Sequence, residues 1–174
     1  MRLRAIEPSD ADLLYRAENE HFVFIRSDNP APYSRKMLSG YAAAYKADPF
    51  TAGELRLVAV CDDGAPAGIV DLYNISLMDR HAYVAIMLLP EFRGKGLSAK
   101  ILQLLIRYAA RALGLSSLLA LVHTDNLPSL SLFRRCGFSQ AGVLNKWSFS
   151  DGKLKDVVIF QLMTDSVRYN DTTL

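Results

Sequence analysis

Hydrophobic and polar positions repeat with two different periods along this 174-residue chain, and each period predicts a different kind of element. Short apolar or alternating runs predict strands. Their ranges are Arg2–Ile6, Glu54–Cys61, Ala65–Asn74, Ala82–Leu89, Leu118–Val122, Val143–Phe149 and Asp156–Met163. Longer segments with apolar residues three or four positions apart predict helices. These run from Ser9 toward Asn19, from Ser34 to about Ala47, from Ser98 to Leu113 and from Pro128 to Cys136.

The order of these elements predicts a mixed α/β sheet. Turn residues at Asp62-Asp63-Gly64 and Ser150-Asp151-Gly152 each separate a pair of strands, which predicts hairpins and therefore antiparallel pairing. A single helical crossover, Ser98–Leu113, lies in the middle, so an alternating doubly wound sheet is not expected. No repeat or linker divides the chain, and we expect one domain over residues 1–164 followed by a polar tail over residues 165–174.

Composition narrows the function mainly by exclusion. The chain is 51% hydrophobic and 22% charged with a net charge of +2, which does not favour nucleic-acid binding. Cys61 and Cys136 fit a reducing compartment better than a disulfide framework, and neither has a Cys or His at metal-ligand spacing, so no metal site is predicted. The N-terminus lacks an export signal, and the most apolar run carries several charges. We therefore expect a cytoplasmic protein without a membrane span.

The most specific chemical signal follows the strand Ala82–Leu89, where the segment Arg93–Gly96 leads directly into the long helix. Glycines let the backbone approach a ligand closely, and the unpaired N–H groups and dipole of a helix start attract phosphate. Arg93 and Lys95 add positive charge beside these groups. The segment Arg93–Ala99 therefore predicts a diphosphate-binding loop.

Two other phosphate-binding motifs fit this loop less well. Gly94, Gly96 and Ala99 satisfy the dinucleotide fingerprint, and Asp125 follows the next strand as a candidate ribose ligand. That fingerprint belongs to the first βαβ unit of a parallel sheet, whereas hairpins flank this loop, so a nucleotide-dependent oxidoreductase stays a remote alternative. A P-loop requires an earlier glycine and a Ser or Thr after the lysine, and Gly96 stands at that position instead.

The loop resembles the acyl-CoA-binding motif Q/R-x-x-G-x-G/A of the GNAT superfamily of N-acetyltransferases. Arg93 and Gly96 occupy its first and fourth positions, while Ser98 stands where Gly or Ala is usual. Downstream, Asn126–Ser129 and Leu132–Phe138 resemble the Asn-x-x-Ser segment and the short helix of the family. The resemblance therefore continues well beyond the glycine loop.

The segment from Gly142 to Asp156 is similar to the subgroup of ribosomal-protein alanine and spermidine or diamine acetyltransferases, and the likeness covers roughly residues 55–163. It implies a mostly antiparallel sheet of six to seven strands with about four helices. Two central parallel strands splay apart in a V, here Ala82–Leu89 and Leu118–Val122, and pantetheine lies between them.

The resemblance implies acetyl-CoA as the cofactor and direct attack by a primary amine in a ternary complex. The acceptor stays open between a polyamine, a protein N-terminus, an amino sugar and another small amine. Homodimers occur in this family, which leaves a homodimer open, and neither nucleic acid nor a membrane is expected as a partner.

On this likeness, the cofactor contacts the end of the first splayed strand, the glycine loop and the short helix. The expected contact residues are Met87, Leu88, Leu89, Arg93, Gly94, Lys95, Gly96, Leu97, Ser98, Ala99, Asn126, Ser129 and Phe133. Backbone groups near Met87 would pair with pantetheine, and the amides from Gly94 to Ala99 would bind the diphosphate. The side chain of Asn126 can both donate and accept hydrogen bonds.

Proton transfer is the part that the resemblance determines least. Many family members carry a tyrosine as general acid where this chain has Phe133, and phenylalanine has no proton to give. By resemblance, Ser129 is then the candidate donor to the departing thiolate. Asn126 is a further candidate catalytic residue, and His123 is the candidate base. An acyl-CoA-binding regulatory module with little turnover is the alternative function.

Acidic residues near the end of the first helix are expected to bind the acceptor amine. Glu18 and Glu20 rank first, because the acceptor-lining loop of the family follows this helix, and Asp28 and Asp71 are further candidates. Tyr83 would also line this site, but it stands where spermidine-type relatives tend to carry a glutamate. This substitution weakens the expectation of a polyamine.

Overall fold

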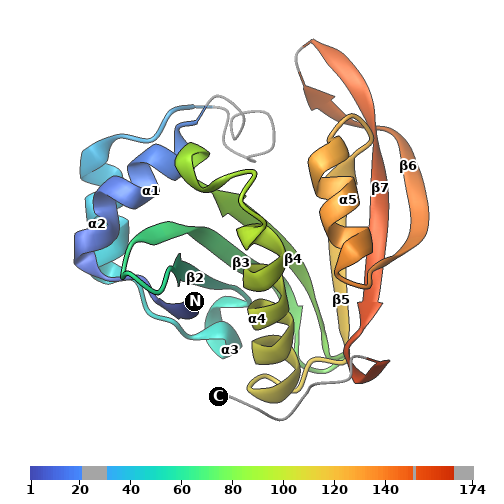
Figure 1. The fold of residues 1–174 in the computed structure, drawn as a ribbon, viewed down its shortest axis with the longest axis horizontal. Helices are drawn as coiled ribbons and strands as arrows, with labels where there is room; N and C mark the ends of the chain where they lie inside the picture. The colour runs from blue at the N-terminus through green and yellow to red at the C-terminus, as the bar shows by residue number, and fades with distance from the viewer. Residues whose placement is uncertain (21–30, 151, 167–174) are drawn as a thin grey trace.

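The computed structural model describes residues 1–20, 31–150 and 152–166, and its seven strands form one sheet in the order β1-β2-β3-β4-β5-β7-β6 (Figure 1). The strands are β1 (Arg2–Ala5), β2 (Leu55–Val60), β3 (Pro66–Ser76), β4 (His81–Leu88), β5 (Ser117–His123), β6 (Ser139–Ser150) and β7 (Lys153–Met163). The helices are α1 (Ala11–Glu18), α2 (Arg35–Ala44), α3 (Pro49–Ala52), α4 (Leu97–Arg111) and α5 (Leu127–Arg135).

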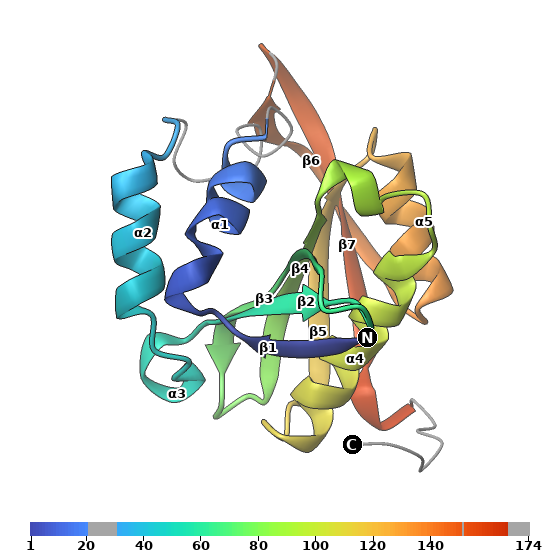
Figure 2. The same cartoon turned by 60° about the vertical axis from the view of Figure 1, so that its left-hand side comes forward.

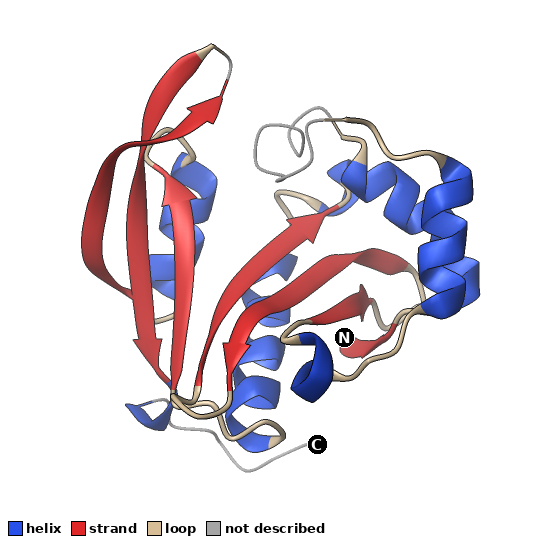
Figure 3. Ribbon diagram, turned by 180° about the vertical axis from the view of Figure 1, so that it is seen from behind, coloured by secondary structure: helices blue, strands red, loops and turns tan. Residues whose placement is uncertain are grey.

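The pairing confirms the predicted mixed, mostly antiparallel sheet with one parallel pair, β4 and β5. This parallel pairing covers only His81–Tyr83 against Ser117–Leu119. Beyond it the two strands separate toward their C-terminal ends, as Figure 3 shows. The predicted V-shaped opening is therefore present between β4 and β5.

Helices cover the sheet on two faces, and the alternation of side chains along the strands explains why (Figure 2). Leu57 and Val84 point to one face and pack with α4 and α5 in the larger hydrophobic cluster. Val58 and Ile69 point to the opposite face and pack with α1 and α2 in a second cluster. A strand that is buried on both faces has no need of alternating polar side chains, which accounts for the apolar run Leu57–Val60 in β2.

The structure differs from the elements predicted from the sequence in segments that bury few hydrophobic side chains, because such segments show no clear hydrophobic pattern. β6 begins at Ser139 rather than Val143, because most of its side chains are exposed and only backbone pairing with β7 defines it. The short helix α3 was not predicted. Asp48 caps α3 by accepting hydrogen bonds from the backbone N–H groups of Phe50 and Thr51.

The chain is anchored just before the predicted polar tail, since the hydroxyl of Thr164 donates to the carbonyl oxygen of Leu115 at 2.7 Å. Residues 167–174 of the tail lie outside the described residues. Within the described part of the chain, none of the helices is long and apolar enough to cross a membrane.

Candidate active site

The predicted diphosphate loop has the conformation that a phosphate-binding helix start requires. Gly94 and Gly96 have φ angles of 72° and 73°, and Gly96 is the N-cap of α4 without a side-chain cap. The first N–H groups of α4 are therefore not satisfied by a capping side chain. A Cβ atom at Gly94 or Gly96 would meet nothing within 4 Å, so space for a ligand lies beside the loop. These features fit the diphosphate of coenzyme A.

The C-terminal end of β4 borders the opening of the sheet. Leu88 pairs in register with Gly68 of β3, and the N–H of Leu89 donates to the carbonyl oxygen of Ala67 at 2.9 Å. On its opposite edge, β4 pairs with β5 only as far as Tyr83. The predicted pantetheine-binding segment Met87–Leu89 therefore forms one edge of the opening.

Ion pairs bring the end of α1 next to the diphosphate loop. The guanidinium of Arg93 binds both carboxylate oxygens of Glu20, with 2.7 Å between Nη1 and Oε1, and its Nε donates to the carbonyl oxygen of Leu88. Arg16 and Glu91 form a second pair at 2.7 Å. The structure thus places Glu20, a predicted acceptor residue, beside the predicted cofactor residue Arg93.

The Asn-x-x-Ser segment forms the start of α5. Oδ1 of Asn126 accepts from the N–H of Ser129 at 3.3 Å, and Nδ2 of Asn126 donates to the hydroxyl of Ser129 at 2.8 Å. Asn126 is buried and is the N-cap of α5. Its structural role as a cap is therefore visible, and its contact with the cofactor stays a prediction.

The two roles of Asn126 can be separated by comparing Asn126→Asp with Asn126→Ala. Aspartate keeps an oxygen that caps the helix but loses the amide donor, so we expect unchanged unfolding stability and acetyl-CoA affinity weakened about tenfold. Alanine should in addition lose about 1 kcal/mol of stability. Calorimetric titration and urea unfolding measure both effects. Unchanged affinity of the aspartate variant would restrict Asn126 to its capping role.

Phe133 lies inside the core rather than at the surface of the opening. Its side chain is buried, its ring meets Phe138 edge to face at 5.1 Å between centroids, and it stacks on Phe160 of β7. Aromatic packing of this kind contributes to the stability of the α5 contact with the sheet. A contact between Phe133 and the cofactor stays a prediction.

His123, the candidate base, ends β5 on the opposite side of the opening from β4. Its side chain is buried, and its Nε2 lies 2.9 Å from the hydroxyl oxygen of Ser148 on β6. A hydrogen bond at one ring nitrogen fixes the orientation of an imidazole. Ser148 was missed by the sequence reasoning, because no local pattern connects it with His123.

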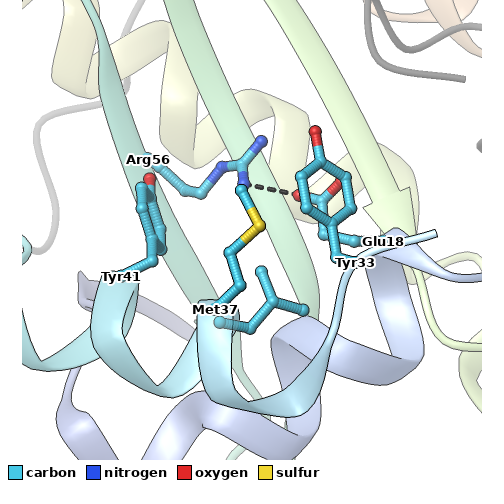
Figure 4. A pocket seen from close by; sticks show the side chains of 6 residues that line it. Glu18, Tyr33, Met37, Tyr41 and Arg56 are labelled. Carbon is cyan, nitrogen blue, oxygen red and sulfur yellow. Dashed lines mark hydrogen bonds and ion pairs between the residues drawn. The ribbon is translucent and has the colours of Figure 1, made fainter. Parts of the chain in front are cut away.

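A cavity of about 190 Å³ lies between α1, α2 and the sheet (Figure 4). Its lining residues are Glu18, Tyr33, Met37, Leu38, Tyr41 and Arg56. Nη1 of Arg56 donates to Oε1 of Glu18 at 2.5 Å, and Nε donates to Oδ1 of Asp71 at 2.8 Å. Burial opposes the charge of Arg56, but the two carboxylates outweigh it and raise its pKa above the ordinary value.

The position of Arg56 is fixed through its backbone as well. Its N–H donates to the hydroxyl oxygen of Tyr45 at 2.6 Å, and that hydroxyl donates to the carbonyl oxygen of Arg56 at 3.0 Å. Sequence reasoning named Glu18 and Asp71 but missed Arg56 between them. The sequence feature that could have indicated Arg56 is its charge within the otherwise apolar strand β2.

Tyr83 lies on the same face of the sheet as Asp71, in register with Tyr73 of β3. The rings of Tyr73 and Tyr83 are 5.4 Å apart between centroids. Tyr83 therefore lies between the Arg56 cavity and the point where β4 and β5 separate. Asp28, a further acceptor candidate, lies outside the described residues. Within the described ranges, no three His, Cys, Asp or Glu side chains are placed to hold a metal ion.

Comparison with known proteins agrees with this geometry. The family model of the acetyltransferase (GNAT) domain matches residues 1–139. Spermidine N(1)-acetyltransferase of Escherichia coli K12 is 29% identical over 164 residues, which are 92% of this chain and 86% of that protein. An L-methionine sulfoximine/L-methionine sulfone acetyltransferase of Pseudomonas aeruginosa is 38% identical over 76 residues, 44% of each chain.

Among solved structures, spermidine N-acetyltransferase of Vibrio cholerae in complex with CoA and spermine superposes with a TM-score of 0.83. The two chains share 25% sequence identity, and the match covers 94% of this chain and 95% of that one. The similarity therefore extends over the whole sheet and the helices on both of its faces.

Proposed function

The chain belongs to the GNAT family of acetyltransferases, and on this premise we propose that its acceptor is a small amine with a second positive charge, of the diamine or polyamine class. It is an N-acetyltransferase that uses acetyl-CoA. The observation that carries the proposal is the buried carboxylate of Glu18 in a cavity lined by tyrosines on the α1 and α2 face. The two spermidine acetyltransferases that this chain resembles over most of its length support it.

The residues of this chain suit the cofactor and its chemistry. The helix start at Gly96 and Leu97 would hold the diphosphate, and the unpaired edge of β4 would hold pantetheine and direct an N–H at the thioester oxygen. When bound, acetyl-CoA supplies the thioester carbonyl carbon with which the acceptor nitrogen forms its new bond.

Two protons must be managed as the C–N bond forms and the C–S bond breaks. We assign His123, oriented by Ser148, to accept the proton of the attacking amine, directly or through water. The hydroxyl of Ser129 would donate a hydrogen bond to the departing thiolate. A thiolate is a better leaving group than an alkoxide, so the missing tyrosine at Phe133 is compatible with turnover.

A thiol-release screen tests the acceptor class. We expect putrescine and spermidine to be acetylated with kcat/KM at least about tenfold above that for free amino acids, N-terminal peptides and amino sugars, since a hydrogen bond to a buried charge stabilises by about 1.5–3 kcal/mol. Equal rates for all classes would contradict the proposal. Acetyl-CoA binding without release for any class would favour the acyl-CoA-binding regulatory module.

We also propose that the enzyme acts in the cytoplasm and does not bind nucleic acid. A homodimer is proposed by likeness to the family, and sedimentation of the purified protein would determine its state.

A further inference from the structure

Among the residues that the structure describes, the ion-paired cluster of Glu18, Arg56 and Asp71 at the cavity carries one net negative charge. Glu18 and Asp71 contribute two carboxylates, and Arg56 cancels one of them through its ion pairs with both. Asp71 is neutralised more completely, because both of its oxygens accept from Arg56, Oδ1 at 2.8 Å and Oδ2 at 3.3 Å. The uncompensated charge therefore lies at Glu18.

The second oxygen of Glu18 is available to a ligand. Arg56 binds Oε1, and among the residues that the structure describes no donor contacts Oε2. Glu18 is nevertheless 92% buried relative to its fully exposed state, since its exposed fraction is 8%. A buried carboxylate without full compensation is costly, so a cation that enters the cavity gains a strong partner.

The walls of the cavity favour a cation and limit its size. Tyr33 and Tyr41 contribute aromatic rings, and Met37 and Leu38 contribute apolar surface. Figure 4 shows Tyr33, Met37 and Tyr41 around Arg56 and Glu18. Aromatic faces attract ammonium groups. Burial raises the pKa of Tyr41 to about 12, so this hydroxyl stays uncharged at neutral pH. The volume of about 190 Å³ suits one short alkylammonium arm.

The cavity lies beside the reaction site. Arg56 of β2, Asp71 of β3 and Ala85 of β4 are aligned in strand register, and Tyr83, two residues before Ala85, is the last β4 residue paired with β5. An acceptor with one end in the cavity can therefore extend along this face toward the opening between β4 and β5.

We infer that this cavity holds the one unreacted ammonium group of a diamine, and that Arg56 determines this selectivity by cancelling one of the two carboxylates. The inference rests on the proposed function and makes it more specific. A single negative charge in the cavity balances the single positive charge of a diamine whose other amine is neutral and can therefore attack the thioester. Spermine would place additional positive charges beside Arg56, and an amino acid would place a carboxylate beside Glu18. Both are expected to react more slowly than putrescine.

The test compares putrescine and spermine with the full-length enzyme in a thiol-release assay. In Arg56→Gln both carboxylates are uncompensated, so we expect the ratio of kcat/KM for spermine to that for putrescine to rise about tenfold. In Glu18→Gln the remaining Arg56–Asp71 pair is neutral, so kcat/KM for putrescine should fall about tenfold while KM for acetyl-CoA is unchanged.

A double variant separates charge from structural damage. Arg56→Gln leaves two buried acids unpaired and can lower stability, whereas Arg56→Gln with Asp71→Asn restores one net negative charge and keeps hydrogen-bonding groups in place. We expect this double variant to regain the wild-type substrate ratio. Arg4→Gln is the matched control, because it removes another partly buried ion pair, with Asp10, outside the cavity; its ratio should equal that of the wild type.

The outcomes distinguish the inference from the proposed function. If wild-type enzyme acetylates no diamine or polyamine, the proposed acceptor class is wrong. If it acetylates amines but the substrate ratio is the same in the wild type and in Arg56→Gln, the charge-matching role of Arg56 is wrong. A double variant that keeps an altered ratio despite a normal melting temperature would overturn the role as well.

Discussion

Replacing Gly96 with glutamate is expected to weaken acetyl-CoA binding about 100-fold or more, because like charges brought together cost several kcal/mol. Gly96 is the N-cap of α4, where the N–H groups and the helix dipole favour an anion. A glutamate there places its carboxylate in the space that the diphosphate would occupy. Calorimetric titration with acetyl-CoA measures the loss.

The substitution also carries a backbone cost that needs its own control. Gly96 has a φ of 73°, a conformation that costs a non-glycine residue about 1–2 kcal/mol. Gly53, which ends α3 with a φ of 67°, is similarly open, and Gly53→Glu repeats the strain and the charge away from the loop. We expect Gly53→Glu to bind acetyl-CoA normally. Equal affinities of Gly96→Glu and wild type would remove this loop from the cofactor site.

Gly68→Ala is expected to have the largest effect on folding stability. A Cβ atom at Gly68 would lie 2.1 Å from the carbonyl oxygen of Met87 and 2.8 Å from Cα of Leu88. Both are backbone atoms, so β3 and β4 must move apart, and we expect a loss of about 3 kcal/mol and a melting temperature lower by about 10 °C. The shift occurs in the segment that we expect to bind pantetheine, so acetyl-CoA affinity should fall as well.

Gly142→Ala is the matched control for this prediction. Gly142 also lies in a strand, β6, and the nearest atom to its added Cβ is a side-chain carbon of Ile159 at 3.9 Å, an ordinary contact. Its stability should be unchanged or slightly increased, since alanine restricts the unfolded chain. Thermal unfolding of both variants measures the difference. A Gly68→Ala protein as stable as wild type would show that β3 and β4 can separate without cost.

Features that depend on a motif of a few consecutive residues were predicted correctly from the sequence, and features that depend on distant residues, on exposed strands or on a single short turn were not. The loop Arg93–Ala99 is defined by a few consecutive residues, and the structure places it at the start of α4, where the sequence predicted it. β6 was placed too short because it is mostly exposed, and α3 was missed because a single short turn has no apolar period.

The acceptor side was predicted only in part. Glu18 and Asp71 were named as acids near the site, but their charge in the folded protein depends on Arg56, which lies 38 and 15 positions away from them in the sequence. The expectation of a simple acidic pocket therefore changes to one in which Arg56 forms ion pairs with both acids.

The amino-acid sequence by itself determined the fold class and a diphosphate-binding loop, because helix periodicity, turn residues and the glycine loop act over short stretches of chain. Coenzyme A as the cofactor followed from the resemblance of this loop and of the Asn126–Phe138 segment to the family. Only the tertiary structure decided which charges are paired. Glu20 with Arg93 and His123 with Ser148 are 73 and 25 positions apart, and strand register and helix packing bring them together. The physical reason is that the pairing of a charge and the orientation of an imidazole depend on which side chains lie nearby in space. The strand register and the helix packing determine which side chains these are.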